Sequence, residues 1–540
     1  MDTNVCYYGD FELEILPEKT VEKTKEIKNL LLGLPQKIMN VEKISAPHNT
    51  DWFNSPIDCQ CLTDGKYAEK ADCNDPAYFH FTVGCARTIL FDLGSVCKIT
   101  GAGVSLLRED AVGVGAPPRI NILLSEDGIG WQKVGELTSL YSEASPAFIR
   151  KTTDFDKAYK ARYVKYSFNV SSHIWIDELE LFGCTDNEGA TAIVPEENKE
   201  NEYPNAYAST EALGSKDVLL AYFCHRDIAP ITKEIFLPHV AYIEDGEIKD
   251  TLFDGYLFLP YVAFLYDKYK KRPLKKEDWQ FYIDNQFIDG YNMDALEAAA
   301  EEVGEKLGIK DYKLSVYFSI LYPVTEVKEF GVIDGKNRDF SLVEDRKAAL
   351  KWLIDEQYAR FNEKQYKHLE LKGYYWFTEE ISYADNQLLE LLQFTTDYVR
   401  GMGLITTWIP YYHASGYNDW QNLGFDVVCY QPNYAFNQAV PDSRLFDAAD
   451  TAKLLGMCIE LEVGGTEPWH IERIKKYYAA GAITGYMKDA AHMYYQGGVP
   501  DVYYKAYKSE DPYLHSVYND TYRFIKGTFK ADEIEFKTEE

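Results

Sequence analysis

The stretch M-C-I-E-L-E-V-G at residues 457–464 decides the fold that we expect for this chain. Its length and its β-branched residues are typical of a buried strand. Alternate residues of a strand point to the same face, so Cys458, Glu460 and Glu462 share one side, opposite the aliphatic residues between them. Burying two acidic side chains inside an ordinary hydrophobic core costs folding free energy. They fit the interior of a (β/α)8 barrel, where inward residues near the C-terminal strand ends form the active site. The alternative is a surface strand with two solvated acids.

Seven further strand-like runs share this part of the chain, and helical patterns with apolar residues three or four apart separate most of them. Alternating strands and helices indicate a parallel sheet, and eight such units predict a (β/α)8 TIM barrel over residues 215–510. A doubly wound open sheet is the alternative, but no G-x-G-x-x-G follows the first strand. The eight predicted strands are Val218–Phe223, Gly255–Leu259, Leu314–Ile320, Gly373–Thr378, Leu404–Ile409, Asp426–Gln431, Met457–Glu462 and Ala482–Met487.

Residues 45–184 have a different pattern, with short alternating strands between Gly, Asp, Asn and Pro turns, which predicts a β-sandwich. The whole chain is therefore predicted to be multidomain. We expect a lead-in at 1–44, the sandwich at 45–184, a polar linker at 185–214, the barrel, and a C-terminal tail at 511–540. The predicted strands of the sandwich include Ile89–Leu93, Gly103–Leu107, Ile120–Ser125, Arg162–Phe168 and Ile174–Phe182.

Charge and hydropathy limit the partners and the location. The 540 residues include 56 basic and 86 acidic side chains, a formal charge of −30, which argues against nucleic acid or an anionic membrane as a partner. No signal peptide is visible, and no apolar run approaches the roughly 20 residues of a membrane span. We expect a soluble, cytoplasmic protein, with a secreted or cell-surface location as the alternative. The ten cysteines are expected to be reduced, with an early disulfide as the alternative.

Polar and aromatic side chains gather where the predicted strands end, which is the composition of a polar cleft with aromatic walls. Tyrosine and tryptophan faces suit sugar rings, and the polar groups suit sugar hydroxyls. For any single tyrosine, packing in the core is at least as well supported as contact with a ligand. The candidate substrate-binding residues are His225, Arg226, Trp376, Trp408, Tyr411, Tyr412, His413, Gln431, Asn433, Tyr434 and Tyr486.

Glycoside hydrolysis requires at least two carboxyl groups, and two sides of a barrel can supply them. By analogy with retaining glycosidases of this fold, Glu379 or Glu380 after strand four is the candidate acid/base, and Glu462 or Glu460 in strand seven is the candidate nucleophile. Strand parity does not choose between Glu379 and Glu380, although a helix-capping role fits Glu380 better. Carboxyl groups about 5–5.5 Å apart would retain configuration, and a gap of roughly 6.5–9.5 Å would invert it.

The N-terminal region resembles the discoidin-like, galactose-binding jelly-roll family. The resemblance rests on L-T-D-G-K-Y at 62–67, R-I-N-I-L-L-S-E-D-G-I-G-W at 119–131, and the segment from A-R-Y-V-K-Y to I-W-I-D-E-L-E-L-F-G at 161–183. It implies a jelly roll with ligand-binding loops at one end, where the candidates are Trp52, His80 and Arg108. Asp64 and Asp72 are candidates for a structural calcium site.

The barrel region resembles a bacterial family known as a domain of unknown function, regarded as a glycoside-hydrolase-like barrel that often follows a discoidin-like module. The resemblance covers roughly residues 215–500 and implies a carbohydrate-related role, with weight on the glutamate after G-Y-Y-W-F-T, which is Glu379. The matching segments are F-D-G-Y-L-F at 253–258, Y-I-D-N-Q-F at 282–287, N-M-D-A-L-E-A-A-A at 292–300, G-Y-Y-W-F-T-E-E-I at 373–381 and I-P-Y-Y at 409–412.

Other chemistries have little support in the sequence. The chain contains no G-x-x-x-x-G-K-[ST], no H-E-x-x-H and no G-x-S-x-G, and its histidines do not cluster as metal ligands would. We therefore expect no metal and no cofactor. The sequence favours a glycoside hydrolase that acts on a glycan or oligosaccharide through paired glutamates. The alternative is a non-catalytic glycan-binding or scaffold protein with an inactive barrel.

Overall fold

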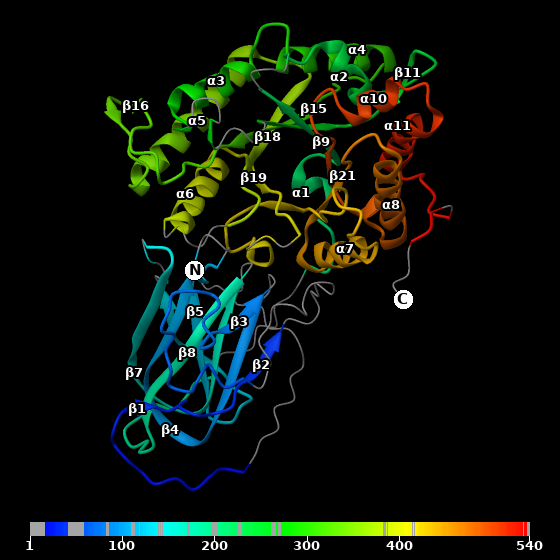
Figure 1. Cartoon of the computed structure of the whole chain (residues 1–540). Coiled ribbons are helices and arrows are strands. Elements are labelled where there is room, and N and C mark those ends of the chain that lie inside the picture. The colour runs from blue at the N-terminus through cyan, green and yellow to red at the C-terminus, as the bar shows by residue number, and fades with distance from the viewer. Residues whose placement is uncertain are drawn as a thin grey trace. The chain divides into compact units, whose positions relative to one another are not determined.

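The computed structural model forms two compact units (Figure 1). One comprises Met1–Glu202, Glu380–Leu388 and His413–Asp419, and the other comprises Tyr203–Glu379, Leu389–Tyr412 and Trp420–Glu540. The residues that the structure describes are 17–40, 59–82, 86–109, 114–117, 119–138, 140, 142, 144–169, 173–195, 204–224, 229–260, 266–267, 272–381, 385, 387–412, 414, 416–532 and 534–536.

The second unit is a closed barrel of eight parallel strands. The strands are short apolar runs, and the second and third are buried along their full length, as expected where both faces are covered. The barrel closes where the last strand pairs with the first, with His492 opposite Asp217. In chain order the strands are β9 (Asp217–Phe223), β12 (Gly255–Pro260), β15 (Leu314–Ile320), β18 (Leu369–Trp376), β19 (Ile405–Trp408), β20 (Val427–Tyr430), β21 (Cys458–Glu462) and β22 (His492–Tyr495).

Helices connect most of the barrel strands, and the sequence explains their faces and ends. In α4 (Met293–Leu307), the buried residues recur about every three or four positions, and the helix ends at Gly308 in the left-handed conformation that favours glycine. The other helices are α1 (Thr210–Leu213), α2 (Lys233–Val240), α3 (Lys276–Gln286), α5 (Val343–Lys364), α6 (Leu388–Gly401), α7 (Ser443–Leu455), α8 (Pro468–Thr484), α9 (Tyr486–Asp489), α10 (Val502–Lys508) and α11 (Pro512–Ile525).

Three short hairpins extend from this unit. The hairpin β10 (Ala241–Glu244) and β11 (Glu247–Thr251) follows α2. The pairs β13 (Tyr266–Asp267) with β14 (Arg272–Pro273) and β16 (Val332–Ile333) with β17 (Lys336–Asn337) lie in the connections after β12 and β15. None of these strands joins the barrel sheet, so the eight-stranded ring is uninterrupted.

The barrel departs from eight regular strand–helix repeats in two places. The eighth strand is β22, at residues 492–495, whereas the predicted run Ala482–Met487 forms the end of α8 and the first half of α9. An apolar run of that length does not by itself distinguish a buried strand from a buried helix. Between β19 and β20, the described residues contain only the 3-10 turn η3 (Tyr417–Asp419), because this connection lacks a helical apolar period.

The first unit contains one connected antiparallel sheet of eight strands. The main order is β1-β8-β4-β7-β5-β6, with β2 paired to β4 and β3 paired to β8. Its core lies among inward aromatic and aliphatic side chains such as Phe91, Ile122 and Tyr166. The strands are β1 (Lys28–Asn29), β2 (Lys37–Asn40), β3 (Phe79–Thr82), β4 (Ala86–Arg108), β5 (Arg119–Ser125), β6 (Gln132–Thr138), β7 (Ala147–Asn169) and β8 (His173–Cys184).

The predicted fold class, a jelly-roll β-sandwich followed by a TIM barrel, is therefore wrong for this unit. Its strands belong to one hydrogen-bonded sheet and do not form a clear jelly roll. The physical reason lies in residues that resemble turns but form bulges. The predicted strands 89–93 and 103–107 are both part of β4, which continues past Gly94 by shifting its register against β7 between Asp92 and Cys97.

The described part of the chain contains one disulfide and six free cysteines. Cys59 and Cys61 form a disulfide, so the early bridge, held as the alternative, is present. Six further cysteines among the described residues are free thiols. Within the part of the chain that the structure describes, no helix is long and apolar enough to cross a membrane.

Candidate functional site

The two acids of β21 point into the barrel. Cys458, which shares their face of the strand, packs in the barrel core with Cys429 of the neighbouring strand. Glu460 is only 2% exposed, and Glu462 is fully buried. The face predicted from the spacing of these acids is thus the inner face, and two carboxyl groups occupy the interior near the C-terminal end of β21.

Glu462 is held by hydrogen bonds on one of its two oxygens. The Tyr477 hydroxyl, on α8, donates to Glu462 Oε2. The backbone N–H of Tyr434 donates to the same oxygen at 3.2 Å. The other oxygen, Oε1, is buried and has no hydrogen-bond partner among the residues that the structure describes. One oxygen is therefore fixed by hydrogen bonds, and the other is a buried acceptor inside the barrel.

Burial and neighbouring charge raise the pKa of both acids of β21. Burial raises the pKa of Glu460 well above its usual range, and the charges of Glu462 and Glu379 raise it further. Burial raises the pKa of Glu462 to about 7, opposed by the hydrogen bonds from Tyr477 and the Tyr434 backbone, while the Glu379 charge raises it. Glu379, which follows β18, thus shares one electrostatic site with the acids of β21.

Glu379 and Glu380 are both exposed, but the Glu379 charge is the one that acts on Glu460 and Glu462. The preceding residue, Thr378, is fixed by two indoles. Trp376 donates to Thr378 Oγ1 at 2.7 Å, and Trp408 of the neighbouring strand donates to the Thr378 carbonyl, also at 2.7 Å. The two tryptophans thus hold the backbone from which Glu379 projects.

The candidate aromatic residues are mostly packing groups. Trp376 and Trp408 are buried, as are Tyr412 and Tyr434, whereas Tyr411 is half-buried. The Tyr434 hydroxyl donates to Asp442 at the start of α7. These rings shape the strand ends from within and do not form an open stacking surface.

Gln431 and Asn433 join two neighbouring strand ends. Gln431 Nε2 donates to the Ile409 carbonyl at 3.1 Å. Asn433 has a left-handed backbone with φ 49°, and its Oδ1 accepts a hydrogen bond from the Tyr412 N–H at 2.8 Å. Their amide groups therefore connect the end of β19 to the end of β20.

The remaining candidates lie elsewhere or are not described. Tyr486 is on α9, where its hydroxyl donates to the Tyr477 carbonyl, and not at the end of strand eight. His225, Arg226, His413 and, in the N-terminal region, Trp52 lie outside the described residues.

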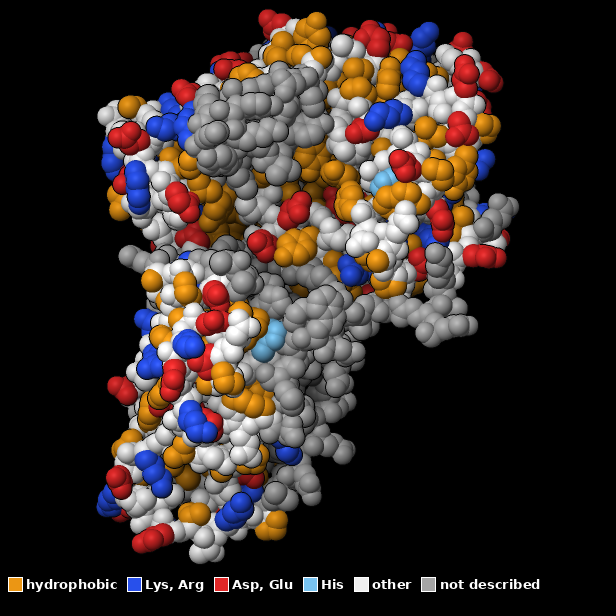
Figure 2. Space-filling model, viewed as in Figure 1, with side chains coloured by type: hydrophobic (Ala, Val, Ile, Leu, Met, Phe, Trp, Pro, Cys, Tyr) orange, Lys and Arg blue, Asp and Glu red, His pale blue; other side chains and the backbone are white. Residues whose placement is uncertain are grey.

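Three further tyrosines inside the barrel were missed by the sequence reasoning. Tyr375 of β18 is buried, and besides burial the charges of Glu379 and Glu460 raise its pKa. Tyr222 and Tyr495 contact each other edge to face, with ring centroids 5.6 Å apart. Figure 2 shows hydrophobic and acidic side chains side by side around a hollow in the unit that contains the barrel. Strand parity places Tyr375 inward, but only after the strand register is known.

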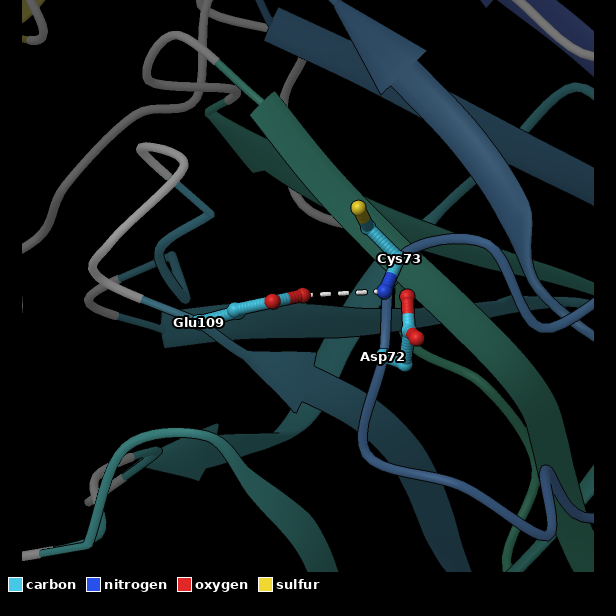
Figure 3. Close-up of side chains that lie close together, drawn as sticks. All are labelled: Asp72, Cys73 and Glu109. Carbon is cyan, nitrogen blue, oxygen red and sulfur yellow. Dashed lines mark hydrogen bonds between the residues drawn. The ribbon is translucent and has the colours of Figure 1, made fainter.

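The candidates of the N-terminal unit do not converge on a metal site. Asp64 pairs with Lys66 at 3.2 Å, and His80 stacks on Trp175 with centroids 3.6 Å apart. Arg108 is buried. Among the described residues, Asp72, Cys73 and Glu109 are the only group of three whose potential ligand atoms all lie within 4.8 Å of one another. The Cys73 N–H donates to the Glu109 carboxylate at 2.9 Å, as Figure 3 shows, and this hydrogen bond by itself accounts for the position of that carboxylate.

No curated protein matches the chain. Among solved structures, CpGH89CBM32-6 of Clostridium perfringens is 18% identical, with a TM-score of 0.19, and covers 29% of this chain and 99% of its own. A chitosan-binding module of a Paenibacillus sp. IK-5 chitosanase/glucanase is 16% identical, with a TM-score of 0.19, and the match covers 29% of this chain and 99% of the module. A Streptococcus pneumoniae fucose binding module is 14% identical, with a TM-score of 0.21, and the match covers 30% of this chain and 99% of the module.

At these TM-scores, the likenesses indicate no function for this chain. The barrel is matched at the level of sequence. Residues 217–523, from the first barrel strand to α11, match a family model, and this is more than half of the chain. The chain therefore belongs to the family described as Domain of unknown function (DUF4855).

Proposed function

We propose that the barrel hydrolyses glycosidic bonds, with Glu379 and Glu462 as the reacting carboxyl groups. The observation that carries this proposal is electrostatic. The charge of Glu379, after the fourth strand, raises the pKa of Glu460 and Glu462 in the seventh strand. This mutual influence on ionisation, between carboxyl groups of two separate strand ends, supports a reaction with one acid and one base.

The environments of the acids support different roles. Glu462 receives two hydrogen bonds on Oε2, and hydrogen bonds to a carboxylate favour its ionised form. Of the two acids on β21, Glu462 is therefore the one that ionises more readily, and we assign it to attack the anomeric carbon or to activate water. Glu379 is exposed, so a substrate can reach it, and we assign its protonated form to donate the proton to the leaving-group oxygen.

Glu460 fits neither role as well. Its burial and the two neighbouring glutamates hold its pKa well above its usual range, which favours its protonated form. A neutral carboxyl group beside Glu462 does not repel the charge on Glu462, and it can donate a hydrogen bond to a substrate hydroxyl. We therefore assign Glu460 to substrate binding.

The test is product release from a panel of oligosaccharides and aryl glycosides, measured for the parent and for three single variants. Glu379→Gln and Glu462→Gln should each lower kcat by at least about a hundredfold, because each removes an acid or a base while preserving shape. Glu380→Gln is the discriminating variant, because it removes a neighbouring exposed charge. We expect it to keep most of the activity.

The outcomes separate the alternatives. Activity that survives Glu379→Gln but is lost in Glu380→Gln would move the acid role to Glu380. Activity that survives Glu462→Gln would remove Glu462 from the reaction. Saturable binding of a glycan without any release of product would identify the barrel as a non-catalytic glycan-binding domain.

A further inference from the structure

Phe436 is an exposed aromatic ring beside the buried acids. It lies in the loop between β20 and α7, and 48% of its surface is exposed. Its ring meets that of Tyr495, at the end of β22, edge to face with centroids 5.5 Å apart. Tyr495 in turn meets Tyr222 of β9. We call Phe436 and Tyr495 together the aromatic ledge.

The aromatic ledge lies directly beside Glu462. Tyr495 is the residue opposite Glu462 in the pairing of β21 with β22, and the Val463 N–H donates to the Tyr495 carbonyl at 3.0 Å. On the other side of β21, the Tyr434 N–H donates to Glu462, and Phe436 follows two residues later. Since the Phe436 ring reaches Tyr495, the ledge crosses the end of β21 just beyond Glu462.

The loop that carries Phe436 is held firmly by α7 and α8. The Arg473 guanidinium lies over the Tyr434 ring, 3.9 Å from its centroid, and it donates to the carbonyls of Tyr434 and Val440. Asp442 accepts a hydrogen bond from the Tyr434 hydroxyl and pairs with Lys476 at 2.9 Å. The exposure of Phe436 is therefore built into a fixed loop, although burying such a ring would be favourable.

We propose that the aromatic ledge binds the apolar face of a neutral pyranose ring that stands beside Glu462. This subsite rests on the proposed carbohydrate function. A pyranose presents C–H groups on its face and hydroxyl groups on its edge, so stacking on the ledge directs its hydroxyls toward Glu460 and Glu462. The negative charge of a uronic acid or a sulfated sugar would be repelled by the ionised forms of Glu379 and Glu462. The ligand class is therefore a neutral sugar.

The test is saturation-transfer NMR with the full-length protein. The probes are the methyl glycosides of glucose, galactose and mannose, with methyl glucuronide as the charged probe. We expect the parent to bind at least one neutral glycoside more tightly than the glucuronide. Phe436→Ala should weaken that binding about tenfold, and Phe436→Tyr, which keeps the ring, should restore it.

Ile483→Ala is the matched control. Ile483 is also an exposed apolar residue, with 57% exposure, and it lies at the far end of α8 from Glu462. It should leave glycoside binding unchanged. Equal binding by the parent and Phe436→Ala would overturn the ledge, and so would binding of no probe by the parent. Tighter binding of the glucuronide would overturn the neutral class.

The two proposals fail separately. Loss of hydrolysis in Glu462→Gln together with unchanged binding in Phe436→Ala would reject the sugar-binding role of the ledge and support the hydrolase proposal. Binding that depends on Phe436, in a parent protein that releases no product from any substrate, would support the sugar-binding role of the ledge and reject the hydrolase proposal.

Discussion

The hydroxyl of Tyr477 on α8 donates a hydrogen bond to Glu462 Oε2 on β21, so a helix outside the barrel positions a carboxyl group inside it. Tyr477 is itself fixed, because its carbonyl accepts a hydrogen bond from the Tyr486 hydroxyl, and its ring meets that of Tyr434 edge to face at 5.6 Å. This relationship connects the geometry of α8 to the ionisation of Glu462.

Tyr477→Phe should lower activity chiefly at acid pH. The hydroxyl favours the ionised form of Glu462, so its removal raises the pKa of that carboxyl further above about 7. A larger fraction of Glu462 is then protonated at pH 6, so kcat/KM at that pH should fall. We expect a fall of about tenfold, which corresponds to the free energy of one hydrogen bond to a charged group. The measurement is the pH profile of kcat/KM, whose acid limb should move to higher pH.

Tyr478→Phe is the control for this change. Tyr478 is the next residue of α8 and is equally buried, but its hydroxyl pairs with Thr521 on α11. It should leave the pH profile in place. A common loss of activity at all pH values in both variants would show that Tyr477 acts only through folding.

Stability should fall as pH rises, in part because of Glu462. Its pKa is about 7 in the folded protein, against the usual 4.5, so between these values the unfolded chain releases a proton that the folded protein keeps. Folding is therefore destabilised progressively from about pH 4.5 to pH 7, by on the order of 3 kcal/mol in total, and not further above pH 7.

Urea unfolding of the parent and Glu462→Gln checks this contribution. The variant cannot ionise at this position, so it should be more stable than the parent at pH 8, and this difference should shrink at pH 4.5. A difference that is the same at both pH values would contradict the raised pKa, because a shape effect of the amide does not titrate.

The inward placement of the two acids on β21 was predictable because it depends only on the period of a strand. Buried apolar runs separated by helical patterns likewise identify most of the parallel strands. The eighth strand was placed wrongly, since Ala482–Met487 is apolar enough for a strand but lies in α8 and α9. The register shifts in β4 were also not visible, because Gly94 occupies a bulge where the sequence indicates a turn.

The side chains around the acids were harder to predict. Trp408 and Phe436 are both aromatic residues close to strand ends, yet Trp408 is buried and Phe436 is exposed. Which ring faces solvent depends on how the loop after β20 is held by Arg473, and that contact joins residues 39 positions apart in the sequence. A local pattern of polar and aromatic residues carries no information about such a contact.

Asp217→Ala should destabilise the barrel where it closes. Asp217 Oδ1 lies 2.9 Å from His492 Nδ1 and accepts a hydrogen bond from the Tyr494 hydroxyl at 2.7 Å, and all three residues are buried. Removing the carboxylate leaves two buried polar groups without this partner, which costs about 3 kcal/mol. Urea unfolding measures the loss. Asp289→Ala, at an acid that is exposed, should cost less than about 1 kcal/mol even though Asp289 pairs with Lys364.

Gly373→Ala should separate the fourth and fifth barrel strands. Gly373 lies opposite Ile405 in the pairing of β18 with β19, and a Cβ at Gly373 would stand 2.3 Å from the Ile405 carbonyl oxygen. Because that oxygen is backbone, β19 must move, at a cost of about 1–3 kcal/mol. The shift also displaces Trp408, which holds Thr378 next to Glu379, so activity should fall together with stability.

Gly401→Ala separates this effect from a general cost of adding a methyl group. Gly401 is the last residue of α6, and a Cβ there meets no atom within 4 Å. Alanine is the better helix former by about 1 kcal/mol, so this variant should be as stable as the parent or more stable. Equal urea midpoints for the two variants would contradict the close approach of β18 and β19. A lower midpoint for Gly373→Ala alone, accompanied by lower activity, supports the fixed strand end from which Glu379 projects.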